Sequence, residues 1–97
     1  MSTFISLVKW TEQGIRNVKD TLKRAEDIKT AGKKTGVNVK EIYWTMGRYD
    51  IVTVMEAPDS ESITAFMLSI GSLGNARTET LVAYNADDMR RIISKMQ

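Results

Sequence analysis

A tyrosine and an aspartate, Tyr49 and Asp50, follow directly after a Gly47-Arg48 corner between two stretches that favour β-strands. A plain hairpin needs neither a phenol nor a carboxylate at its return point, so the pair is a candidate for catalysis or binding. An aspartate whose pKa is raised by burial can act as a general base, and a tyrosine hydroxyl beside it can polarise a substrate.

The range of chemistry open to the chain is narrow, because its 97 residues include no cysteine and no histidine. This composition excludes disulfides, thiol nucleophiles, zinc sites built from Cys and His, and the usual haem ligand. It also removes the commonest general base near neutral pH. We therefore expect no metal and no cofactor, and a binding role is favoured over catalysis.

The composition predicts a single domain over residues 1–97. Hydrophobic residues make up 42% of the chain and charged residues 27%, which is typical of a globular protein, and the chain is too short for two cores. No stretch has the pattern of a secretory signal or the length of a membrane helix. A cytoplasmic protein without membrane contact is therefore expected.

The net charge of +2 is unevenly distributed. Residues 1–40 hold nine Lys or Arg against four Asp or Glu, and residues 41–97 hold five against eight. The lysines of the first half fall between apolar helix positions, with no accompanying basic-aromatic motif. We interpret them as a solvated helix face and expect no nucleic-acid partner.

The hydrophobic pattern predicts four strands separated by helices. The strands are expected at residues 3–9, 38–45, 49–56 and 76–84. Helices are expected at residues 11–35, with a kink or short first turn at 14–20, after a cap at Asp59 or Ser60, and after a cap at Asn85 with Asp88 as its partner.

This order predicts an α+β fold of the ferredoxin-like βαββαβ type, with an antiparallel four-stranded sheet, strand order 4-1-3-2, and an extra C-terminal helix. Right-handed crossovers place both long helices on one face of the sheet. Yet the strands carry apolar residues toward both faces, with Ile5 and Leu7 opposing Phe4 and Val8. A second copy of the sheet would cover the other face, so we expect a homodimer, a dimeric α+β barrel.

The predicted topology gathers unusual polar and aromatic residues at one edge of the sheet, where the first strand ends and the third and fourth begin. The candidate ligand-binding residues there are Trp10, Arg16, Tyr49, Asp50, Asn75 and Arg77, with Gly47 as the turn residue. Aromatic rings with a few convergent polar groups are typical of a ligand pocket.

Each of these residues also has a purely structural interpretation. Tyr49 can be a rim aromatic, and Trp10 can pack in a core or dimer contact. Asp50 can pair with Arg77 or Arg48, or it can cap a turn. Arg77 can hold an anionic group of a ligand, or it can hold Asp50 or Glu79. The sequence leaves these alternatives open.

Two stretches, "TMGRYDIVTVMEAPD" and "LGNARTETLVAY", closely resemble the GYD-domain proteins, small bacterial and archaeal proteins, as does the opening "SLVKWTEQGIRNVKD". The resemblance covers about residues 4–93, and its most specific pieces are Gly47, Tyr49 and Asp50, then Gly74 with Arg77-Thr78, and Thr11 with Gly14-Ile15. In this chain Arg48 separates the glycine from the tyrosine.

The resemblance implies the dimeric α+β barrel fold and no established activity. Proteins of similar fold include cofactor-free monooxygenases, haem-degrading enzymes and ligand-sensing domains of regulators, and a shared fold does not choose among these functions.

Three functions follow as hypotheses. The favoured one is a homodimeric module that binds a small polar or anionic metabolite at the corner, with Arg16 and Arg77 holding its charge. The second is a structural or assembly module whose corner residues set the oligomer. The third is a cofactor-independent oxygenase or isomerase with Asp50 as base and Tyr49 as electrophile.

Overall fold

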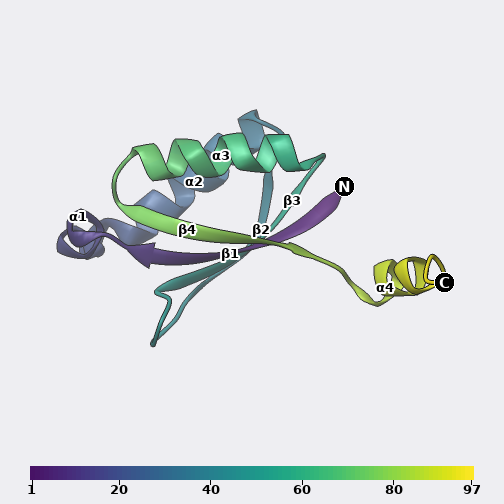
Figure 1. Ribbon diagram of the computed structural model, residues 1–97. Helices are drawn as coiled ribbons and strands as arrows, with labels where there is room; N and C mark the ends of the chain where they lie inside the picture. Colours follow the sequence, from purple (N-terminus) through teal and green to yellow (C-terminus); the bar gives the residue numbers. More distant parts are fainter.

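Two helices lie across one face of an antiparallel four-stranded sheet in the computed structural model of the chain, which describes residues 1–97 (Figure 1). The strands are β1 (Ser2–Trp10), β2 (Asn38–Trp44), β3 (Ile51–Ala57) and β4 (Ala76–Ala83). Their order in the sheet is β2-β3-β1-β4. This is the predicted order, and it confirms the ferredoxin-like α+β fold.

The helical segments are α1 (Glu12–Arg16), a 3-10 turn, η1 (Val18–Asp20), α2 (Thr21–Lys34), α3 (Ser60–Ser72) and α4 (Ala86–Ile93). The helix predicted at residues 11–35 is therefore interrupted within 14–20, where a break was expected. The interruption falls at Asn17, whose side-chain amide donates to the carbonyl of Gln13 at 3.0 Å. This side chain satisfies a carbonyl at the frayed end of α1.

The predicted helix caps are confirmed. The Asp59 carboxylate accepts a hydrogen bond from the backbone N–H of Ser62 at 2.8 Å, and Asn85 and Asp88 form a reciprocal capping box at the start of α4. The Ser62 bond holds the pKa of Asp59 below its ordinary value, and the Asn85 N–H, then the Arg91 guanidinium, does the same for the pKa of Asp88. Both carboxylates are therefore ionised where they cap.

The helix-facing side of the sheet carries the core. Alternation along β1 buries every second side chain from Phe4 to Val8, and Phe4 lies opposite Met55 in the register of β1 and β3. The buried core cluster consists of Phe4, Val37, Met55, Ala57, Ile63 and Phe66. Period-2 alternation on the sheet meets one apolar stripe from α3, as the sequence pattern predicts.

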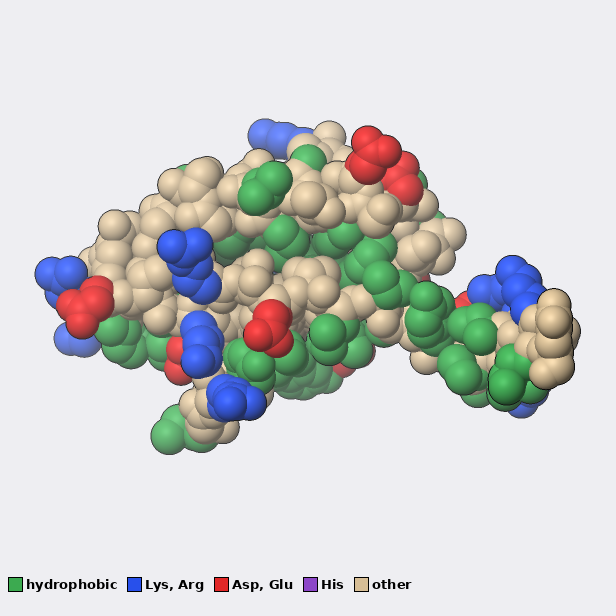
Figure 2. All heavy atoms as spheres, in the orientation of Figure 1, with side chains coloured by type: hydrophobic (Ala, Val, Ile, Leu, Met, Phe, Trp, Pro, Cys, Tyr) green, Lys and Arg blue, Asp and Glu red, His purple; other side chains and the backbone are tan.

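The opposite side of the sheet, which we call the open face, has no helix over it (Figure 1). Ile5 lies between Val54 of β3 and Leu81 of β4, and Leu7 lies beside Val52. Figure 2 shows hydrophobic side chains gathered beneath the sheet. The predicted two-faced apolar pattern is therefore present in the registered strands.

Helix α4 extends from the end of β4 away from the sheet and from the other helices (Figures 1 and 2). On this helix the apolar side chains of Met89 and Ile93 are exposed to 42% and 56% of their full area, and Met96, just after the helix, is exposed to 73%. The helix thus carries an apolar stripe that the rest of the chain does not cover. No helix of the chain combines the length and the apolar character needed to cross a membrane.

The start of β3 differs from the prediction. The strand begins at Ile51 instead of residue 49, so Tyr49 and Asp50 belong to the loop that joins β2 to β3. Gly47 has a φ of +115° in this loop, which favours glycine. The extra loop length releases Tyr49 and Asp50 from the alternation of the strand.

Candidate functional site

The corner predicted from the sequence lies where β1 ends and where β3 and β4 begin. Asp50 stands at its centre. Its carboxylate accepts a hydrogen bond from the backbone N–H of Trp10 at 2.9 Å, and its own N–H donates to the carbonyl of Val8 at 2.8 Å. Its carbonyl accepts from the N–H of Thr45, also at 2.8 Å. Asp50 therefore joins the end of β1 to both ends of the β2–β3 loop.

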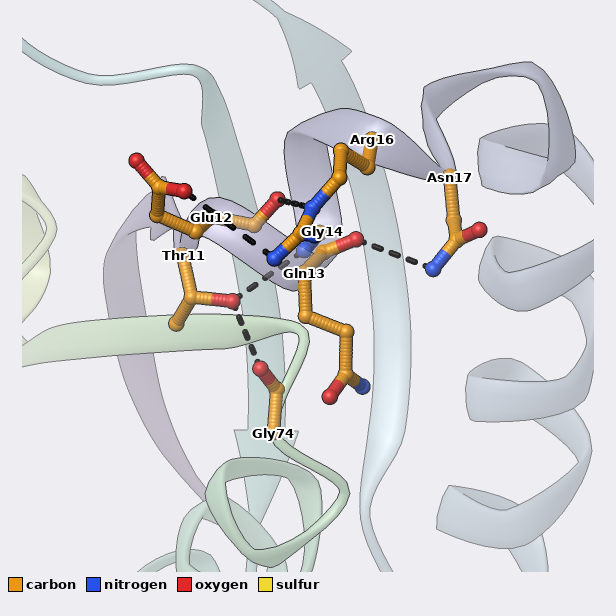
Figure 3. Close-up of polar contacts among 7 residues, drawn as sticks. All are labelled: Thr11, Glu12, Gln13, Gly14, Arg16, Asn17 and Gly74. Atoms are coloured by element: carbon orange, nitrogen blue, oxygen red, sulfur yellow. Dashed lines mark hydrogen bonds and ion pairs between the residues drawn. The ribbon is translucent and has the colours of Figure 1, made fainter.

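A second junction lies where α1 meets the loop before β4 (Figure 3). The Thr11 hydroxyl donates to the carbonyl of Gly74 at 2.6 Å and accepts from the N–H of Gly14 at 3.1 Å. The N–H of Thr11 donates to the carbonyl of Asn75 at 3.1 Å. Gly14 is buried against that same carbonyl, and a side-chain carbon built on it would lie 1.9 Å from the oxygen. Only glycine permits this approach.

Tyr49 and Arg77 lie with the open face and not with the Trp10 side of the corner. The Tyr49 hydroxyl donates to the Glu79 carboxylate at 3.1 Å, and the Lys9 ammonium lies 5.9 Å from the centre of the Tyr49 ring. Arg77 pairs with Lys9 in the register of β1 and β4 and forms no ion pair within the chain. Two cations thus stand side by side at this end of the open face.

Arg16 contacts neither the Asp50 junction nor the Tyr49 and Arg77 end of the open face. Its guanidinium forms an ion pair with Glu12 at 3.9 Å across one turn of α1, and both side chains are largely exposed (Figure 3). Such an exposed pair contributes little to stability.

The predicted residues therefore divide into a hydrogen-bonded joint (Trp10, Asp50 and Asn75), an end of the open face (Tyr49 and Arg77), and an exposed helix position (Arg16). Asp50 pairs with a backbone N–H and with neither of the arginines considered, and no group of three or more carboxylates in the chain is placed to hold a metal ion. The Asp50 carboxylate, the Trp10 backbone N–H and the Asn75 side-chain oxygen already have partners inside the chain.

Gln13 belongs to the joint and was missed from the sequence. Its side-chain amide donates to the Leu73 carbonyl at 3.2 Å and to the Asn75 side-chain oxygen at 3.0 Å. A glutamine in the first turn of a helix has no distinctive pattern, and only the meeting of α1 with the loop before β4 gives it this role.

Charged side chains lie at both ends of the open face. Lys9, Arg77 and Glu79 lie at the end near the joint, and Glu56, which forms an ion pair with Lys40 at 3.7 Å, lies toward the other end in register with Thr3. Glu41 lies between them, in register with Val54. The Glu41 carboxylate accepts a hydrogen bond from the Tyr43 hydroxyl, and this bond raises the pKa of Tyr43 above its ordinary value. Tyr43 is therefore a neutral phenol on this face.

Residues 4–93 match the GYD domain family. The chain belongs to this family. A curated relative, the glutamine synthetase and cystathionine beta-lyase binding protein of Thermus thermophilus, is 32% identical over 90 residues, which cover 92% of the chain and 95% of the relative. The residues by which the sequence resembled the family include Asp50, which accepts from the N–H of Trp10, and Gly14 and Gly74, both of which hydrogen-bond with the Thr11 hydroxyl.

Two solved structures share the fold. The crystal structure of FFRP-DM1 superposes with a TM-score of 0.63 at 20% identity and covers 87% of the chain and 100% of its own. The crystal structure of TTHA0845 from Thermus thermophilus gives a TM-score of 0.56 at 25% identity and covers 89% of the chain and 96% of its own.

The role of Asp50 as a structural acceptor makes a prediction. Asp50→Ala leaves the N–H of Trp10 without a partner and should lower the free energy of unfolding by about 1–3 kcal/mol, as urea denaturation would measure. Asp50→Asn keeps an acceptor oxygen, so its free energy of unfolding should fall by less. Equal stability of Asp50→Ala and the wild type would contradict this role.

The close approach at Gly14 makes a second prediction. Gly14→Ala should lower the free energy of unfolding by about 2–3 kcal/mol, because the new methyl group collides with the carbonyl of Asn75. Gly71→Ala on α3 is the matched control, since no atom lies within 4 Å of the added carbon there. The control should gain about 0.5–1 kcal/mol from helix propensity.

Proposed function

We propose that the chain is a homodimeric, non-catalytic binding module, and that the partner of the dimer is a metabolic enzyme. The open face is the observation that supports a dimer. Ile5, Leu7 and Val54 form an apolar surface there with no helix over it. An apolar sheet face is stable in water only when another layer covers it.

A second copy of the chain is the occupant that the size of the surface favours. Four strands about 4.8 Å apart and about 25 Å long give a sheet face of roughly 500 Å² in projection. A stable interface takes about 800 Å² from each partner. Helix α4 can supply the remainder, because it leaves from β4 at the border of the open face and carries its own uncovered stripe.

An eight-residue helix that stands alone is marginal in water, whatever its caps. Its apolar stripe needs a surface, and the rest of its own chain does not provide one. A dimer in which each α4 packs on the other copy gives both uncovered surfaces a single explanation.

The proposed enzyme partner is inferred from the curated relative of Thermus thermophilus. That protein is named for binding glutamine synthetase and cystathionine beta-lyase, and the match extends over nearly its whole length. The corner, which suggested a metabolite site from its sequence, uses most of its polar atoms in internal bonds. A dimer joined through its open faces keeps both helical layers outside, where two identical surfaces suit a symmetric enzyme.

The dimer makes a testable prediction. Wild-type protein should elute from a sizing column and scatter light as a particle of twice the mass of one chain. Val54→Asp puts a charge in the middle of the buried face and should give monomers that melt at lower temperature. Leu68→Asp on the exposed side of α3 is the matched control and should stay dimeric. A monomeric wild type would contradict the proposal.

The enzyme partner is tested directly. With the dimer immobilised, the glutamine synthetase and the cystathionine beta-lyase of the same host are passed over it, with serum albumin as control. Saturable binding of at least one, with a Kd below about 10 μM, is expected. If neither enzyme binds and a polar metabolite instead raises the Tm of the wild type but not of Arg77→Ala, the corner is the binding site and the proposed partner is wrong.

A further inference from the structure

A groove with a volume of about 680 Å³ runs between α3 and β4 on the helix-facing side of the sheet (Figures 1 and 2). One side of α3 forms its first wall, and the outer strand of the sheet forms the second. The groove meets the candidate site only at Arg77. Because the open face lies on the other side of the sheet, a dimer joined through its open faces would leave this groove accessible.

The strand β4 lies at the edge of the sheet, and one row of its backbone groups has no partner in the chain. The N–H of Thr11 donates to the carbonyl of Asn75 at 3.1 Å, one step beyond the pairing of Trp10 with Ala76. Hydrogen-bonded pairs alternate with non-bonded pairs in an antiparallel ladder. The odd-numbered residues of β4 therefore bond to β1, and the even-numbered residues direct their N–H and C=O groups outward. These outward residues are Ala76, Thr78, Thr80 and Val82.

The same four residues also line the groove. Val82 lies opposite Phe4 in the register, and Thr80 lies opposite Ser6, so their side chains are on the side of the sheet that carries the core. The free backbone groups and the sheet wall of the groove thus belong to one row of residues. An extended chain laid along this row would form main-chain hydrogen bonds and direct every second side chain into the groove.

The groove favours a segment with alternate apolar side chains. Leu68 on α3 is 69% exposed, and Val82 on β4 is 53% exposed. Gly71 leaves room on the helix wall, because no atom lies within 4 Å of a side-chain carbon built on it. Arg77 is the only charged residue that lines the groove, and it forms no ion pair within the chain. A carboxylate of the bound segment near Arg77 would add a charge-assisted hydrogen bond.

The opposite edge of the sheet is built differently. The strand β2 has a bulge between Val39 and Glu41, and Lys40 within it pairs with Glu56 at 3.7 Å. Bulges and lysines prevent pairing at exposed edges of sheets. The strand β4 has no lysine and no proline, and its register with β1 runs without a shift. The chain thus protects one edge and leaves the other able to accept a strand.

We propose that the groove binds an extended segment of the enzyme partner, which joins β4 as a fifth strand and places alternate apolar side chains between α3 and the sheet. This role of the groove rests on the proposed function, because it describes how that partner is held. The free edge of β4 supplies the affinity through main-chain bonds, and the groove supplies the specificity.

Hydrogen exchange tests the added strand residue by residue. In the free wild-type dimer the outward N–H groups of β4 should exchange fast, whereas the odd-numbered ones, which bond to β1, should exchange slowly. With the glutamine synthetase or the cystathionine beta-lyase of the same host bound, the outward groups should slow by about 10-fold or more, and the odd-numbered groups are the internal control. Exchange is stopped in acid, and each amide is read after the complex dissociates.

Two results of this experiment would overturn the proposal. Outward N–H groups that are already slow in the free dimer would show that a second copy occupies the edge of β4. Outward groups that stay fast in the complex would show that the enzyme binds elsewhere on the dimer.

A proline tests the same edge by binding. Val82→Pro removes an outward N–H without breaking a bond to β1, and an edge strand tolerates proline at such a position. It should weaken enzyme binding by about 10-fold or more, because a main-chain bond is lost and the ring obstructs the added strand. Val82→Thr keeps the N–H and the branched shape, so its Kd should stay within about 3-fold of the wild-type value. Equal binding by Val82→Pro and the wild type would contradict strand addition.

The helix wall is tested independently of the edge. Leu68→Asp, which should stay dimeric, places a charge against apolar side chains and should weaken enzyme binding by about 10-fold or more. Leu22→Asp on α2, where the leucine is 67% exposed, is the matched control and should bind as the wild type does. If the wild type binds an enzyme and Leu68→Asp binds it equally well, the groove is not the site and the proposed function stands. If the wild type binds neither enzyme, the proposed function and the groove fail together.

Discussion

A sheet has two faces, and the two long helices of this chain cover only one of them. The strands nevertheless place apolar side chains such as Ile5 and Val54 on the uncovered side. Alternation with a period of two makes this unavoidable whenever a strand is apolar throughout. The proposed second copy would relieve that one imbalance.

The joint at the end of β1 explains why conspicuous residues in a small protein need not be catalytic. Asp50 uses its side chain and its backbone to connect three segments, and Gly14 lets α1 touch the loop before β4. These contacts hold together elements that are distant in sequence, where a ferredoxin-like chain must cross from one half to the other. A carboxylate so engaged is an architectural group.

The sequence predicted the strand order, the helix caps and the interrupted first helix, because each depends on local periodicity or on a capping side chain such as Asp59. It did not predict that Asp50 leaves the strand or that its partner is the backbone N–H of Trp10, since that contact joins residues 40 positions apart. Nor did it predict the row of hydroxyl side chains that Thr53, Ser6 and Thr80 form across β3, β1 and β4. Ser6 is an ordinary serine until the register of three strands sets it beside Thr53 and Thr80.

Only 11 of the 97 residues are buried within one chain, which is a thin core for a domain of this length. If the second copy supplies the missing burial, folding and association become one event, and the fraction of folded protein depends on how much protein is present. Chains made at low abundance would then remain partly unfolded and open to proteases. The uncovered sheet would in this way set a threshold of expression below which the cell keeps no working protein.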